Sequence, residues 1–246
     1  DAALRAGCGL SSVIIGKTLA EALIPHIIES TLFPVADNGE GTMLFDEEEF
    51  KSALDGAASI CVGMGWGQGE DYPKILEYIL MNYNLPLVID ADGINTIAKM
   101  NTDTLKKTNC KVILTPHLKE FSRLSNYSIE EIMDRPVQIA KDYANRNNVI
   151  LLLKGTTTII TDGEEVLLTD TGTPAMAKGG SGDVLSGIIA GINAFSKESI
   201  LLNTAAAAYI NGKAAEFACI EKNEYSALPS DTIHNIYKAI NYIIEK

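Results

Sequence analysis

The sequence has few basic, sulfur-containing and aromatic residues. Its 246 residues include 4 cysteines and 1 tryptophan, and Lys and Arg number 20 against 32 for Asp and Glu. The net charge of −12 argues against nucleic acid or an anionic membrane as a main partner, because both repel an acidic protein. No apolar run reaches the length of a membrane span, and no signal peptide is visible. The cysteines are scattered with no C-x-x-C pair, so we expect reduced core side chains of a cytoplasmic protein rather than disulfides or zinc ligands.

Two nucleotide-binding motifs are incomplete. Gly16-Lys17-Thr18 resembles the end of a P-loop, but the earlier glycine of that motif is replaced by Ser11. The stretch 63–69 has glycine at every second position, with Gln68 where a Rossmann fingerprint needs its third glycine. Both patterns therefore disfavour these two modes of nucleotide binding.

Strand-like and helix-like segments alternate along the chain. Continuous Val, Ile and Leu runs, each followed by a helix, predict a mainly parallel sheet covered on both faces. A small β-meander and a helical C-terminal region follow. The predicted strands are 10–15, 31–35, 60–62, 85–89, 111–114, 149–153, 156–161 and 166–170. The predicted helices are 18–28 with a break at Pro25, 46–54, 72–81, 94–100, 119–124, 136–145, 183–194, 199–219 and 231–244.

The start of the chain has the features of a helix end. Residues 1–7 are typical of the last turns of a helix that stops at Gly7, and the first residue is Asp1 rather than methionine. We therefore expect that a preceding segment is missing and that a sheet edge lies open near Asp1. No linker divides residues 1–246, which predicts a single domain.

The most informative stretch is Gly179-Gly180-Ser181-Gly182-Asp183, followed by the uncharged run 184–191. It predicts a buried helix beginning near Ser181 or Gly182, whose free N–H groups favour an anion. A carboxylate beside a phosphate site is useful if it accepts the proton of a hydroxyl that attacks the phosphate, which makes Asp183 a candidate general base. The alternative is that Ser181 or Asp183 is an ordinary helix N-cap.

Other polar stretches also follow the predicted strands. Ligands of parallel sheets bind beyond the carboxyl ends of the strands, so we expect these stretches to meet in one site. Each stretch also has a structural interpretation. His117 is equally a substrate contact or a structural histidine, and Glu120 is a helix-dipole partner or, less favoured, a carboxylate behind a magnesium ion. Asp90 and Asp92 either hold a magnesium ion with its phosphate or cap a helix. Lys154 either contacts a nucleotide phosphate or marks the point where a strand leaves the core.

Together these motifs resemble the ribokinase-like superfamily, and most closely its ADP/ATP-dependent NAD(P)H-hydrate dehydratase branch. The resemblance extends through 62–67, 88–95, 114–120 and 153–157 in the family's order and spacing, and covers nearly the whole chain. It implies a three-layer α/β/α sandwich with a mainly parallel central sheet and a small β-meander. It also implies that hydrated NADH or NADPH is dehydrated after phosphorylation of the ring hydroxyl, a metabolite repair reaction. Alternatives are a small-molecule kinase of the same superfamily, acting on hydroxyethylthiazole or a sugar, and a nucleotide-binding protein without turnover.

The resemblance implies roles for individual residues. Asp183 would be the catalytic base. Glu120, from its place in the sequence alone, is the candidate carboxylate behind a magnesium ion. Substrate contacts would come from Gly65, His117, Asn95 and Asp183. Nucleotide contacts would come from Lys154, Gly155, Thr156, Thr157, Thr158, Gly180, Ser181 and Gly182. The implied reactants and partners are NAD(P)H hydrate, ADP or ATP with Mg²⁺, further copies of the chain in a tetramer, and NAD(P)H-hydrate epimerase.

The sequence departs from the family in two places. Leu118-Lys119 follows the histidine where the family has Pro-Gly, so the loop is expected to have a different shape. The family's first strand, its glycine-rich turn and a substrate-contacting alanine would lie before Asp1.

Overall fold

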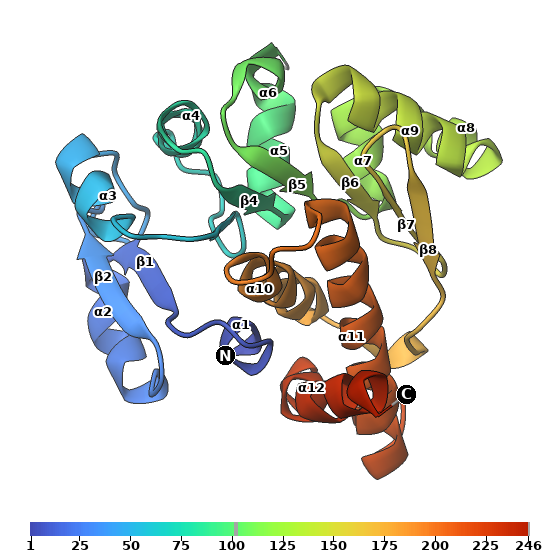
Figure 1. The fold of residues 1–246 in the computed structure, drawn as a ribbon. Helices are drawn as coiled ribbons and strands as arrows, with labels where there is room; N and C mark the ends of the chain where they lie inside the picture. The colour runs from blue at the N-terminus through green and yellow to red at the C-terminus, as the bar shows by residue number, and fades with distance from the viewer. Residues whose placement is uncertain (101–102, 246) are drawn as a thin grey trace.

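The computed structural model describes residues 1–100 and 103–245. Within them, a parallel pair β1-β2 lies beside a larger sheet in the order β3-β4-β5-β6-β7-β8 (Figure 1). Strands β3 to β6 are parallel, and β7 and β8 continue the sheet antiparallel as the predicted meander. The strands are β1 (Ser12–Gly16), β2 (Thr31–Val35), β3 (Ile60–Val62), β4 (Pro86–Ile89), β5 (Lys111–Leu114), β6 (Ile150–Leu153), β7 (Thr158–Thr161) and β8 (Val166–Thr169).

Helices connect the strands and follow the meander. The α-helices are α1 (Ala2–Arg5), α2 (Lys17–Leu23), α3 (Glu47–Ala53), α4 (Tyr72–Asn82), α5 (Ala91–Lys99), α6 (Asp103–Lys107), α7 (Leu118–Ser125), α8 (Ile129–Asp134), α9 (Pro136–Asn147), α10 (Ser181–Asn193), α11 (Ile200–Glu221) and α12 (Pro229–Ile244). Two short 3₁₀ helices cover Ile24–His26 and Pro174–Met176. No helix in the described ranges is long and apolar enough to cross a bilayer.

The larger sheet separates two apolar cores, because successive side chains of a strand point to opposite faces. On β4, Leu87 and Ile89 belong to one core, and Val88 belongs to the other. Helices α4 to α9 cover the first face, since β3 to β6 follow one another in a single direction and right-handed crossovers then put their helices on one side. Helices α1, α10, α11 and α12 cover the second face. This arrangement confirms the three-layer α/β/α sandwich.

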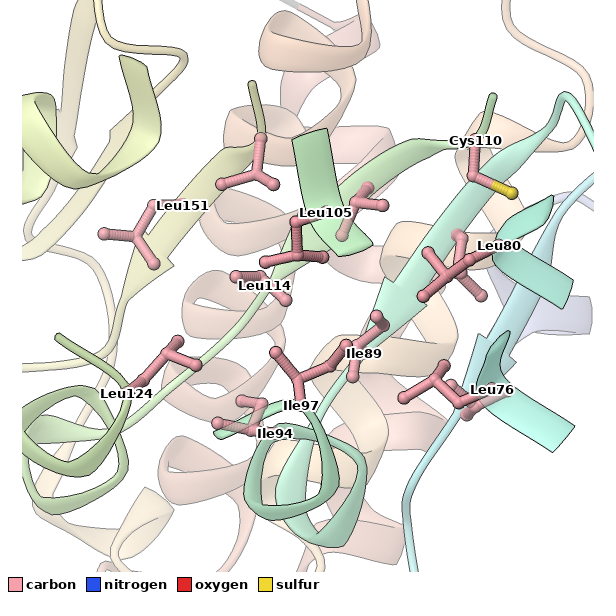
Figure 2. Packing of buried hydrophobic residues seen from close by; sticks show 14 of the residues in the cluster. Leu76, Leu80, Ile89, Ile94, Ile97, Leu105, Cys110, Leu114, Leu124 and Leu151 are labelled. Carbon is pink, nitrogen blue, oxygen red and sulfur yellow. The ribbon is translucent and has the colours of Figure 1, made fainter. Parts of the chain in front are cut away.

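Figure 2 shows how the first core is filled. Side chains of α4, α5 and α7 lie over the strands, and the largest of them are fully buried. The labelled side chains are Leu76, Leu80, Ile89, Ile94, Ile97, Leu105, Cys110, Leu114, Leu124 and Leu151. All four cysteines are free thiols, but of these only Cys110 is buried, and Cys8, Cys61 and Cys219 are partly exposed.

Several predicted elements needed correction. Helix α5 begins at Ala91 rather than at Ile94, with Ala91 at the positive φ of 49° directly after Asp90. The strand predicted over 156–161 begins at Thr158, because the preceding residues form the turn between β6 and β7. Helices α6 and α8 were missed, although Ser128 and Glu131 of α8 form the S-x-x-E capping box, a recognisable signal in the sequence.

In the described part of the N-terminal region, β1, β2 and β3 each have one unpaired edge. Helix α1 begins at Ala2, and Gly7 has a φ of 111° that an L side chain rarely adopts. In the described part of the chain, β1 is hydrogen-bonded only to β2, and β3 only to β4. That residues 1–246 form a single domain remains a prediction.

Leu114 tests the contribution of the first core. It is 0% exposed at the centre of the sheet, so Leu114→Ala should lower the free energy of unfolding by about 2–5 kcal/mol. The matched control is Leu168→Ala on β8, where the leucine is 60% exposed and the expected change is within about 0.5 kcal/mol. Urea unfolding measures both, and equal losses in the two variants would contradict this description of the core.

Candidate active site

The first turn of α10 is built as the sequence predicted. The helix begins at Ser181 after Gly180, whose φ of 94° is the left-handed conformation that glycine tolerates. Val184 N–H makes the first intrahelical bond, to the Gly180 carbonyl, so the N–H groups of Gly182 and Asp183 remain available for an anion. No side chain caps this helix, and the interpretation of Ser181 or Asp183 as an ordinary N-cap is therefore wrong.

Lys178 holds the segment in front of α10. Its ammonium donates hydrogen bonds to the carbonyls of Glu224, Tyr225 and Ala227 in the loop after α11. This lysine is thereby committed to the loop. The anion site in the first turn of α10 depends on backbone N–H groups rather than on Lys178.

A buried ion pair lies against the same turn. Asp90, at the end of β4, is 1% exposed and accepts hydrogen bonds from Lys154 Nζ and Ser186 Oγ, each at 2.8 Å. A Cβ added to Gly182 would lie 3.3 Å from Asp90 Oδ2 and 3.4 Å from Lys154 Nζ. The ion pair therefore packs directly beneath the backbone that carries Asp183.

These charges act on each other's protonation. Burial opposes ionisation of Asp90, but the Lys154 ammonium and the hydroxyls of Ser186 and Thr115 hold the pKa of Asp90 below its ordinary value. Asp183 reaches solvent, yet partial burial and the charge of Asp90 raise the pKa of Asp183, against an opposing effect of Lys154. A carboxylate with a raised pKa is a stronger base, as a proton acceptor requires.

The glycine-rich loop after β3 is locked onto the start of α5. Gly63, with a φ of 108°, leaves no room for a side chain, because a Cβ there would lie 2.1 Å from the Asp90 carbonyl oxygen. The Asp92 carboxylate accepts hydrogen bonds from Gly67 N–H at 2.8 Å and from Asn95 Nδ2 at 3.4 Å. Asp92 thus ties this loop to Asn95.

Gly65 and Trp66 form the outer part of this loop. Gly65 is exposed, and nothing lies within 4 Å of the position of a Cβ on it. Trp66 stacks on Tyr72 with the ring centroids 4.8 Å apart. The loop thereby presents an open glycine beside a fixed aromatic ring.

His117 and Glu120 cap the start of α7. His117 Nδ1 accepts the N–H groups of Lys119 and Glu120, and the buried Glu120 carboxylate accepts the N–H of His117 at 2.8 Å. Glu120 therefore has the structural role at the start of α7 that was one of its two interpretations. Its other role, behind a metal ion, stays a prediction. His117 is half exposed, so its ring is available to a substrate as well as to the helix.

The ends of β5 and β6 are brought together. Lys154 N–H donates to the Pro116 carbonyl at 2.9 Å, and His117 and Lys154 form an isolated parallel bridge. Gly155, Thr156 and Thr157 form an exposed turn beyond Lys154, and Thr158 is the first residue of β7. The predicted nucleotide segment therefore projects from the same sheet edge as His117.

Ser186 is a site residue that sequence reasoning missed. It is fully buried one turn after Asp183, as a hydroxyl in an otherwise apolar run, and this isolated polarity was the available signal. In the described residues, no group of three or more His, Cys, Asp or Glu is arranged to hold a metal ion. A magnesium ion would therefore depend on phosphate oxygens for most of its ligands.

The fold is that of a ribokinase-like protein, and a solved structure of a ribokinase-like superfamily protein from Enterococcus faecalis shares it with a TM-score of 0.80 at 26% identity. A family model described as NAD(P)H-hydrate dehydratase matches residues 1–238. The chain belongs to the NAD(P)H-hydrate dehydratase family.

Individual relatives agree with this assignment. The ADP-dependent (S)-NAD(P)H-hydrate dehydratase of Cenarchaeum symbiosum is 36% identical, over 88% of this chain and 74% of that protein. The bifunctional NAD(P)H-hydrate repair enzyme Nnr of Hyperthermus butylicus is 32% identical over 99% of this chain and 45% of its own length, so the chain spans about half of that relative. The ADP/ATP-dependent NAD(P)H-hydrate dehydratase of Bacillus subtilis, crystallised with ATP and Mg²⁺, superposes with a TM-score of 0.75 at 25% identity, over 98% of this chain and 84% of that one.

Two variants of His117 separate helix capping from substrate contact. His117→Ala should lower the free energy of unfolding by about 1 kcal/mol, and His117→Ser should restore it, because a serine hydroxyl is a good N-cap acceptor. If the imidazole contacts the substrate, both variants lose kcat/KM for hydrated NADH to a similar extent. Wild-type kcat/KM in the serine variant would show that His117 only caps α7.

Proposed function

We propose that the chain catalyses the ADP- or ATP-dependent dehydration of hydrated NADH and NADPH. The observation that carries the proposal is the position of Asp183 in the uncapped first turn of α10, above the Asp90–Lys154 ion pair. One turn thus combines a proton acceptor with an anion site. The names of the relatives supply the substrate class, and 36% identity to a dehydratase supports its transfer to this chain.

The proposed reaction has two steps. Asp183 accepts the proton of the ring hydroxyl, whose oxygen then forms a bond to the terminal phosphorus of the nucleotide, while the bond from that phosphorus to the bridging oxygen breaks. Next, the new phosphate leaves with the electrons of the carbon–oxygen bond. The ring loses a proton from the adjacent carbon to water, and NADH or NADPH is restored. The N–H groups of Gly182 and Asp183 stabilise the negative charge on the transferring phosphate.

The site suits a nucleotide phosphate with its magnesium ion. Gly179 has open space where a side chain would lie, and Lys154 Nζ lies beside Gly182. Mg²⁺, when bound with the nucleotide, neutralises the phosphate charges. Lys154 and the exposed turn 155–157 would contact the nucleotide from the β6–β7 side, and His117, Gly65 and Asn95 would contact the hydrated nicotinamide.

The remaining expectations concern partners. The bifunctional repair enzymes among the relatives support an NAD(P)H-hydrate epimerase as the functional partner. The four free thiols fit the reducing cytoplasm, where we place the reaction. A tetramer is proposed from the family resemblance, and sedimentation equilibrium measures it.

Asp183→Asn tests the base. The variant should lose about 10²- to 10⁴-fold in kcat, since an amide cannot take the proton, while nucleotide binding survives on the unchanged backbone N–H groups. Recovery of NADH absorbance measures turnover, and the fluorescence of Trp66, the 1 tryptophan of the chain, reports binding. Asp142→Asn on the exposed face of α9 is the matched control and should retain full activity. More than a small fraction of wild-type kcat in Asp183→Asn would remove Asp183 as the base.

A substrate panel separates the dehydratase from a small-molecule kinase. Hydrated NADH, and in parallel a set of small alcohols and sugars, is incubated with ADP or ATP and Mg²⁺. We expect recovery of the NADH absorbance with phosphate release. Formation of only a phosphorylated alcohol or sugar would assign the kinase function, and no product at all would assign nucleotide binding without turnover.

A further inference from the structure

Asp90 is the most deeply buried charged residue of the site. Its carboxylate joins three elements: Asp90 directly follows β4, it pairs with Lys154 directly after β6, and it accepts a hydrogen bond from the Ser186 hydroxyl on α10. The side chain of Lys154 is 24% exposed against 2% for that of Asp90, so the ammonium is the part of the pair that reaches toward solvent.

The ion pair contacts the backbone that carries the base. A Cβ on Gly182 would lie only 3.3–3.4 Å from the two charged groups, which is tighter than most side-chain contacts. Ser186 lies one turn further along α10 and is fixed to the same carboxylate. Movement of Asp90 would therefore displace both the first turn of α10 and the Lys154 ammonium.

The charged and titratable groups around Asp183 come from three strands or the residues directly after them. Partial burial raises the pKa of Asp183, Asp90 directly after β4 raises it further, and Lys154 after β6 lowers it. Cys61 on β3 is the third group, and burial together with the charges of Asp90 and Asp183 raises the pKa of its thiol, so it stays uncharged at neutral pH. Of the charges near Asp183, those of Asp90 and Lys154 therefore act on its pKa in opposite directions.

We propose that Asp90 is a positioning residue of the reaction: it fixes Lys154 and the first turn of α10, and it sets a negative charge against the backbone that carries Asp183. The proposal rests on the proposed role of Asp183 as the proton acceptor. Asp90 acts through Lys154 and α10 and does not itself take the proton, because its carboxylate is sealed by the two hydrogen bonds.

Asp90→Asn is the first test. The amide keeps the shape but removes the charge, so Asp183 should titrate at lower pH, and the acid limb of the kcat/KM profile should move to lower pH. The loss of fixed geometry should also reduce kcat at the optimum by about 10- to 100-fold, with a smaller change in KM. An acid limb at the wild-type pH, or one moved to higher pH, in a folded variant would overturn the proposal.

The double variant Asp90→Asn/Lys154→Met tests the opposite sign. With Asp90 already neutral, removal of the positive charge should raise the pKa of Asp183, so the acid limb should lie at higher pH than in Asp90→Asn alone. Lys154→Met alone does not make this test, because it leaves the Asp90 carboxylate buried without its cation, and that carboxylate would take a proton. If Asp90→Asn does not fold, Ser186→Ala and the double variant, which leaves no unpaired charge, decide the matter. Ser186→Ala should lower kcat without moving the limb, because it removes a hydrogen bond and no charge. Wild-type kcat in both of these variants, or a limb in the double variant at or below that of Asp90→Asn, would count against the proposal.

The matched control is Glu49→Gln in α3. It removes the carboxylate of another ion pair between elements, Lys17–Glu49, which lies in the β1-β2 region away from α10 (Figure 1). Neither the acid limb nor kcat should change. A shift equal to that of Asp90→Asn would mean that any lost charge moves the profile.

A second readout keeps the two proposals distinguishable. Carbon-13 NMR titration of the Asp183 carboxyl reports its pKa without turnover, so the predicted shifts in Asp90→Asn and in the double variant are measurable even if hydrated NADH is not the substrate. Shifts of the predicted signs without dehydration would retain the charge coupling and reject the proposed function. Dehydration with no shift in either variant would retain the function and reject the role of Asp90.

Discussion

Asp90 carries a negative charge at a position that is 1% exposed, and a charge so placed must be paired to be tolerated. Its partner, Lys154, comes from β6 and reaches across the end of β5, which lies between β4 and β6. Ser186 of α10 satisfies the second carboxylate oxygen. This one side chain fixes the relative position of three parts of the site: the carboxyl end of β4, the β6–β7 turn and the start of α10. The proposed chemistry uses all three.

The order of the sheet brings these groups to one edge. Strands β3 to β6 run parallel in sequence order, so their carboxyl ends lie together, and each connecting loop begins there. Backbone fit then sets the details. Gly63 approaches the Asp90 carbonyl so closely that only glycine is accommodated, and Asp92 N–H donates to the Gly63 carbonyl. The loop after β3 and the start of α5 therefore fold as one unit, and the positive φ of Ala91 lies within it.

The parts of this architecture that sequence alone predicted are those with local causes. The continuous apolar strands and the glycine-rich start of α10 are written in consecutive residues, and the structure confirms them. The Asp90–Lys154 pair joins residues 64 positions apart, and nothing local distinguishes it from two strand-end polar residues. The sequence also did not reveal the histidine cap of α7, because histidine is not a usual N-cap residue. The H-x-x-E motif has the spacing of the familiar capping box but histidine in place of its serine or threonine.

The position of Asp183 combines opposing electrostatic demands. The start of a helix favours negative charge, which helps the phosphate to bind but weakens a carboxylate as a base. A carboxylate that is too acidic takes a proton poorly, while one that is too basic is protonated before the substrate arrives. Partial burial and Asp90 oppose the first effect and Lys154 the second, and both charged groups lie within 3.3–3.4 Å of the position of a Cβ on Gly182. In the proposed reaction, a buried pair of opposite charges, rather than a single charge, would let one helix start attract a phosphate and still present a competent base, because each member offsets what the other would do alone.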